Sequence, residues 1–154
     1  MRKRMFSLLL GICLIAGVFV FPAHAETVEG IYGDNIKWHF DDSTGTLTIS
    51  GTGVAARINE ASGEAYDQYR LSIRHVVIED GITEIAPYAF NHIYYLESVW
   101  IGDTVKIIGN FAFGDNRNVT QLYIGKSVTT IGEYAFGYME SLQSLVLPTS
   151  VREI

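Results

Sequence analysis

Apolar residues recur every 23 positions through the second half of the chain, from Val76 to Ile154. In this register the sequence forms three complete rows, 76–98, 99–121 and 122–144, and a partial row, 145–154. The matched apolar columns are Ile78, Ile101, Ile124 and Leu147; Ile82, Val105, Val128 and Val151; Ile85, Ile108, Ile131 and Ile154; and Leu96, Val119 and Leu142. Such a pattern predicts a β-rich repeat solenoid, whose coils bury their apolar side chains against one another.

A short parallel strand is expected where each row begins. The spacing Leu96-x-x-Val99-x-Ile101 recurs from Val119 and again from Leu142. An Ala-Phe pair follows in each complete row, and we expect it on a short helical turn of the return limb. Gly109 and Gly132 would mark a turn before that helix, with Ala86 in the same place in the first row. Pro87 suits the first turn of a helix, where no amide donor is needed.

These rows resemble the BspA-like leucine-rich repeats of bacterial surface proteins. The matching segments share one nine-residue pattern. It begins with valine or isoleucine and two variable residues, continues with isoleucine followed by glycine or alanine, and ends with two variable residues and Ala-Phe. The segments are 82–90, 105–113 and 128–136. The resemblance implies a leucine-rich-repeat fold, and it implies adhesion to proteins or other cells as the role.

The segment 26–75 is interpreted as an N-terminal β-hairpin cap with a connector. Apolar and polar residues alternate in 36–40 and again in 46–50, which predicts two strands. Gly45 would supply the unusual backbone angle of the turn between them. Similar lead-in segments precede many BspA-like arrays, so we expect this hairpin to cover the apolar end of the first coil.

Residues 1–25 have the pattern of a cleaved secretory signal peptide. Three basic residues, Arg2, Lys3 and Arg4, precede an apolar run, and Ala23-His24-Ala25 provides small residues around a cleavage point. Cleavage would remove Cys13, the single cysteine of the chain, and so exclude disulfides. The remaining 8 basic and 17 acidic residues give a net charge of −9. That charge argues against nucleic acid and, after cleavage, against an anionic membrane as partner.

Candidate chemistry is weak throughout the sequence, and we predict no enzyme, no cofactor and no metal site. His39, His75 and His92 lack a second ligand at the spacing of zinc sites. Asp41 and Asp42 lie in the expected hairpin turn and lack the alternating ligands of a calcium loop. Neither a nucleophile motif nor a phosphate-binding loop is present.

Surface recognition is the remaining hypothesis. Because strand residues alternate sides, one row of outward residues should cross the sheet: Val77, Trp100, Tyr123 and Val146. We call these four residues the outward ladder. Its large rings with polar tips suit an interface, although cross-strand stacking that only stabilises the sheet also explains them.

The sequence therefore predicts a secreted or cell-surface binding module that recognises an extracellular protein or glycan. The alternative is a structural spacer, or an N-terminal fragment, of a larger surface protein. The partial row 145–154 would leave apolar side chains uncovered at the C-terminal edge, and self-association through that edge is expected.

Overall fold

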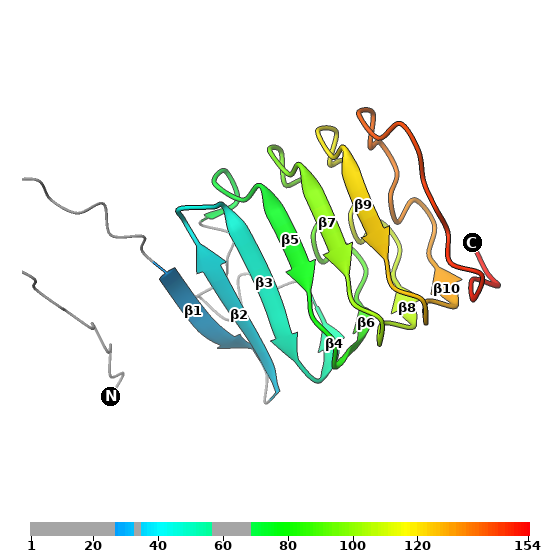
Figure 1. Ribbon diagram of the computed structural model, residues 1–154, viewed down its shortest axis with the longest axis horizontal. Coiled ribbons are helices and arrows are strands. Elements are labelled where there is room, and N and C mark those ends of the chain that lie inside the picture. Colours follow the sequence, from blue (N-terminus) through cyan, green and yellow to red (C-terminus); the bar gives the residue numbers. More distant parts are fainter. Residues whose placement is uncertain (1–26, 33–34, 57–68) are drawn as a thin grey trace, which may run out of the picture.

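The computed structural model describes residues 27–32, 35–56 and 69–154. Within these ranges the chain forms two sheets that run side by side along the long axis of the molecule (Figure 1). The larger has the strand order β1 (Thr27–Tyr32), β2 (Ile36–Asp41), β3 (Thr46–Gly51), β5 (His75–Ile78), β7 (Ser98–Ile101) and β9 (Gln121–Ile124). The smaller has the order β10 (Thr130–Ile131), β8 (Ile107–Ile108), β6 (Ile82–Ile85) and β4 (Gly53–Ala55).

The expected strands at the starts of the three complete rows are present and parallel, whereas the partial row begins without one. His75 of β5 pairs with Ser98 of β7, which pairs in turn with Gln121 of β9. Paired residues therefore lie 23 positions apart along the chain. Side chains alternate along these strands between buried and accessible, as the sequence pattern predicts.

The expected helical turns are wrong, because the described part of the chain contains no α-helix. Tyr88, Phe111 and Tyr134 have φ angles of 59°, 52° and 51°, which a right-handed helix does not allow. Every second backbone amide at this turn bonds to the neighbouring coil, and the amides between them bond three residues back in their own coil. The Phe90 amide, for example, donates to the Ala112 carbonyl at 2.7 Å. These hydrogen bonds between coils replace those that a helix would make within one coil.

Gly109 and Gly132 begin a turn, as predicted, since their carbonyls accept from the Ala112 and Ala135 amides at 3.2 and 3.1 Å, although no helix follows. The same glycines allow close packing between coils. A Cβ atom on Gly109 would lie 2.5 Å from the Pro87 nitrogen. One on Gly132 would lie 2.5 Å from the Asn110 nitrogen. Backbone atoms cannot move aside at such distances, so any side chain would push the coils apart.

The core lies between the two sheets and contains the matched apolar columns. In the complete rows Ile82, Val105 and Val128 are fully buried, as are the alanines of the Ala-Phe pairs or nearly so. The phenylalanine rings stack along the molecule, with centroids 5.1 Å apart for Phe90 and Phe113. In the partial row Leu147 and Ile154 are exposed, because within the described chain no further coil covers them.

The hairpin predicted from 36–40 and 46–50 is confirmed as β2 paired antiparallel with β3. Gly45 has the expected positive φ, 68°. Two features were not predicted: β1 pairs with β2 at the edge of the sheet, and β4 joins the smaller sheet. Because β3 pairs in parallel with β5, the hairpin continues directly into the repeat sheet.

The predicted signal peptide, residues 1–25, lies outside the described residues, as does most of the connector at 57–68. Among the residues that the structure describes, no helix has the length and apolar character needed to cross a membrane.

Candidate functional site

Three members of the outward ladder lie side by side on the solvent face of the larger sheet. Val77 pairs with Trp100 between β5 and β7, and Trp100 pairs with Tyr123 between β7 and β9. Trp100 is 52% exposed and Tyr123 39%, whereas Val77 is half-buried. The strand register therefore brings together the two large rings that the sequence singled out.

Val146 does not extend this arrangement as a fourth paired residue. Residues 142–148 form no strand, and Val146 is 78% exposed. The partial row is held to the third coil mainly after this segment, where the Arg152 amide donates to the Thr129 carbonyl at 2.9 Å. The paired part of the outward ladder thus consists of Val77, Trp100 and Tyr123.

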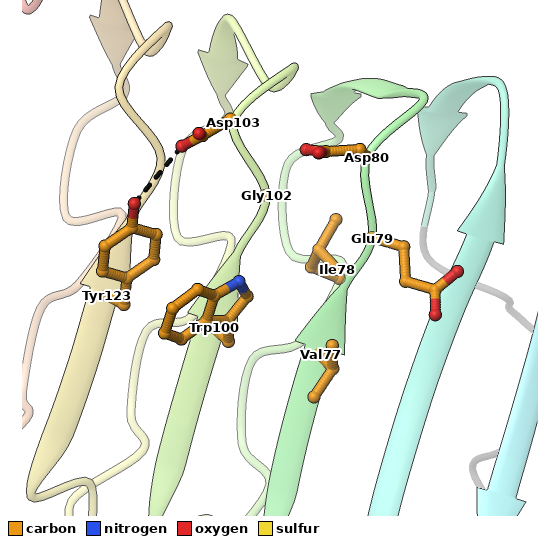
Figure 2. Close-up of a pocket in the computed structure, with 8 residues that line it drawn as sticks. All are labelled: Val77, Ile78, Glu79, Asp80, Trp100, Gly102, Asp103 and Tyr123. Atoms are coloured by element: carbon orange, nitrogen blue, oxygen red, sulfur yellow. Dashed lines mark hydrogen bonds between the residues drawn. The ribbon is translucent and has the colours of Figure 1, made fainter.

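The rings of Trp100 and Tyr123 stack face to face. Their centroids are 3.9 Å apart and their planes differ by 16°. One face of the indole is therefore covered by Tyr123, and the opposite face is directed toward β5, where the residue in register is the smaller Val77. This difference in size leaves a hollow of about 410 Å³ beside the indole. Figure 2 shows the residues that line it, which come from the ends of β5, β7 and β9 and the turns that follow.

Glycines follow the two rings along their strands, and both pack closely against the preceding coil. At Gly102 and Gly125 the next outward position has no side chain. The carboxylate of Asp80 occupies the space over Gly102, since a Cβ atom there would lie 2.9 Å from Asp80 Oδ1. The turn after β5 therefore places a carboxylate on the wall of the same hollow, at the strand ends beyond the aromatic pair (Figure 2).

Asp103, in the turn after β7, is fully engaged by the next coil. Its Oδ1 accepts hydrogen bonds from the Tyr123 hydroxyl at 3.3 Å and from the Lys126 amide at 3.1 Å. Its Oδ2 lies 2.7 Å from Lys126 Nζ. The hydrogen bonds from Lys126 hold the pKa of Asp103 below its ordinary value of 3.8. The same contact raises the pKa of Lys126 above 10.5.

We expect the substitution Lys126→Met to raise the pKa of Asp103 toward 3.8, because it removes the side-chain hydrogen bond that is the largest cause of the shift. A carbon-detected NMR titration of the carboxyl groups measures this pKa directly. The folded-state pKa of Asp103 lies below the unfolded one, so its contribution to stability is present above the unfolded value. That contribution is lost as the pH falls through the folded pKa.

Asp41 provides the internal control for this titration. Its pKa is lowered chiefly by a hydrogen bond from the Ser43 side chain, which the substitution does not touch. An unchanged Asp103 pKa in the variant would show that Lys126 does not set it.

Sequence reasoning missed the charged turn residues beside the rings. Asp80, Asp103 and Lys126 are related by the same 23-residue spacing as the apolar columns. That spacing was the available signal, because it places all three at one end of the sheet. Two of these side chains are acidic and one is basic, however, so a search for the same residue type at every 23rd position does not find them.

The histidines considered for metal binding lie in separate places. His75 Nδ1 lies 2.8 Å from the Ser98 hydroxyl, and His92 Nε2 lies 3.2 Å from Asp115 Oδ2. His39 is on the exposed face of β2. In the part of the chain that the structure describes, no group of three or more histidine, cysteine or acidic side chains is arranged to hold a metal ion.

Comparisons with known proteins agree on the repeat fold. The family model for the BspA type leucine rich repeat region (6 copies) matches residues 62–154. A leucine-rich repeat protein from Eubacterium ventriosum is 27% identical with a TM-score of 0.62, over 83% of this chain and 40% of its own. None of the curated proteins that were compared matches the chain.

Two further solved structures are similar in fold. The leucine-rich repeat protein of T. pallidum is 20% identical with a TM-score of 0.54, over 80% of this chain and 63% of its own. That of Bacteroides ovatus is 20% identical with a TM-score of 0.51, over 80% of this chain and 37% of its own. The chain therefore spans less than two thirds of the length of each of these three proteins.

Proposed function

The chain belongs to the BspA-type leucine-rich repeat family, and from this premise we propose that it is a secreted or cell-surface module that recognises an extracellular protein or glycan in adhesion. Recognition uses the outward face of the larger sheet. The hairpin β2–β3 caps the apolar end of the first 23-residue coil, and the signal peptide directs export.

The observation that carries this proposal is the exposed stack of Trp100 and Tyr123. Large rings with polar tips contribute much of the affinity in protein interfaces, because they bury a large area with few rotatable bonds. Here they lie beside an open hollow that is lined by both apolar and charged groups. Stacking between strands stabilises the sheet as well, so the experiment must separate binding from folding.

We expect Trp100→Ala and Tyr123→Ala each to weaken binding by about tenfold or more, the effect of a modest interface hot spot. The measurement is binding of the purified chain to a panel of extracellular matrix proteins and to a glycan array, followed by affinity determination for each positive. Thr83→Ala is the matched control, because Thr83 is exposed on the opposite, smaller sheet. If both ring variants fold and bind as the parent does, this face is not the recognition surface.

Self-association through the C-terminal coil is a second element of the proposal. Leu145, Val146 and Ile154 are exposed there, and Ile154 is 81% accessible. Exposed apolar side chains beside unpaired strand edges favour contact with a second copy. Sedimentation over a range of concentrations tests this, and a monomer at every concentration would count against it.

A structural role is the second candidate function. In that case the repeats hold other domains of a larger surface protein apart. The chain covers only 40% of the Eubacterium ventriosum protein, which favours this alternative. The binding measurement with the Trp100 and Tyr123 variants tests this role too. If the chain is only a spacer, neither substitution should weaken binding to any partner.

A further inference from the structure

The hollow beside Trp100 combines an aromatic face that Tyr123 does not cover with carboxylate groups along its wall. One face of the indole lies against Tyr123, and the other is directed over Val77. The hollow of about 410 Å³ on this side of the ring gives a flat group room to approach the free face.

Three carboxylates belong to the wall of this hollow: Glu79, Asp80 and Asp103. Asp103 is neutralised by Lys126 at 2.7 Å. Among the described residues, Glu79 and Asp80 have no salt-bridge partner, and Figure 2 shows their carboxylates on either side of β5, above Val77. The Asp80 carboxylate points to the side of β5 on which Trp100 lies, whereas Glu79 points away toward β3 (Figure 2). Asp80 thus places a negative charge on the wall of the hollow, and this charge also helps to raise the pKa of Lys126.

A planar cation is the group that uses both features at once. An arginine guanidinium group stacks on an indole face through cation–π attraction, and its fork of N–H donors binds a carboxylate. A lysine ammonium group is a compact point charge that cannot stack in this way. An anionic group would be repelled by Glu79 and Asp80, and the acidic balance of the chain, 17 acidic against 11 basic residues, acts in the same direction.

We infer that the hollow binds an exposed arginine side chain of a partner protein, with the guanidinium group over the free face of Trp100 and hydrogen-bonded to Asp80. This inference rests on the proposed recognition function and names the chemistry of its partner. Gly102 leaves the path to Asp80 free of side chains, and Lys126 keeps Asp103 engaged within the protein.

The test is an NMR titration of the nitrogen-15-labelled chain at low ionic strength. The probe is a short glycine-rich peptide with two arginines. It is compared with the same peptide in which both arginines are replaced by citrulline, which is neutral, or by lysine, which is charged. The chain has two tryptophans, so two indole N–H signals are expected, and Trp100→Phe assigns them. Trp38 is 3% exposed and serves as the internal reference.

We expect the arginine peptide to shift the Trp100 signal saturably and to leave the Trp38 signal unchanged. Binding of the citrulline peptide should be weaker by about tenfold, because both the cation–π attraction and the charged hydrogen bonds are lost. Asp80→Asn should weaken binding of the arginine peptide about threefold to tenfold. Glu133→Gln is the control with the same change of charge, since Glu133 is exposed on the return limb. It should change the affinity for the arginine peptide only by the small amount that the loss of one distant negative charge causes.

Several results would overturn the inference. Equal binding of the arginine and citrulline peptides would do so, as would equal losses for Asp80→Asn and Glu133→Gln, because attraction would then be unspecific. An absent Trp100 shift with the arginine peptide also overturns it. If a neutral oligosaccharide such as cellohexaose shifts the Trp100 signal and the arginine peptide does not, the partner chemistry is wrong while the proposed recognition face stands.

Discussion

The substitution Phe113→Ala should lower the free energy of unfolding by about 3–5 kcal/mol, the range for removing a buried aromatic ring. Phe113 is fully buried. Its ring lies between Phe90 at 5.1 Å and Phe136 at 5.9 Å, so it contacts both neighbouring coils. The Phe113 amide also donates to the Ala135 carbonyl at 2.8 Å, which fixes the spacing between the two backbones. The space left by the ring therefore cannot close.

Urea denaturation followed by circular dichroism measures this loss. The matched control is Phe111→Ala, in the same coil, where the ring is half-buried in a surface stack between Tyr88 at 5.3 Å and Tyr134 at 5.1 Å. For Phe111→Ala we expect the free energy of unfolding to fall by about 1–2 kcal/mol, because solvent already reaches the ring and can fill the space that it leaves. Equal losses for the two variants would show that the inner phenylalanine column is not the main support of the stack of coils.

The substitution Asn116→Leu should lower the free energy of unfolding by about 2–4 kcal/mol, although leucine is similar in size to asparagine and apolar like the surroundings of this position. Asn116 is fully buried and satisfies three backbone groups. Its Nδ2 donates to the carbonyls of Phe90 at 2.9 Å and Phe113 at 2.8 Å, and its Oδ1 accepts from the Ile93 amide at 2.8 Å. Leucine would leave all three without a partner in the interior, and each unpaired buried group is costly.

The same denaturation experiment tests this prediction, with hydrogen exchange of the Ile93 amide as a local measurement. Met139→Leu is the control, since Met139 occupies the same column one coil later and makes no such hydrogen bonds there. An apolar exchange of this kind should cost less than about 1.5 kcal/mol. A stability gain for Asn116→Leu would mean that packing outweighs the hydrogen bonds at this position.

Much of the repeat sheet follows from the sequence. The 23-residue register predicted β5, β7 and β9 and the buried columns such as Ile82, Val105 and Val128. It also placed Trp100 next to Tyr123. These features are predictable because the alternation of apolar and polar residues and the 23-residue repeat are both present in the sequence. Coils of equal length that share the same apolar positions stack in one register.

The return limb could not be predicted in the same way. The Ala-Phe pairs and Pro87 have local preferences compatible with a helix, and the isolated segment offers nothing to oppose it. In the folded molecule Tyr88 and Phe111 adopt positive φ angles, because their amides then reach the carbonyls of the next coil. The short strands β6, β8 and β10 arise from the same contacts between coils.

The sequence alone predicted a β-rich repeat fold with a hairpin before it and aromatic residues on one face, and its resemblance to BspA-like repeats indicated the leucine-rich-repeat family. These conclusions depend on periodicity, which every coil repeats. Only the tertiary structure decided how the return limb is built and which charges lie beside Trp100. Asp80 lies over Gly102, and Lys126 neutralises Asp103, because stacked coils bring together side chains that are 20 or more positions apart. No local preference encodes such contacts, and the proposed recognition surface depends on them.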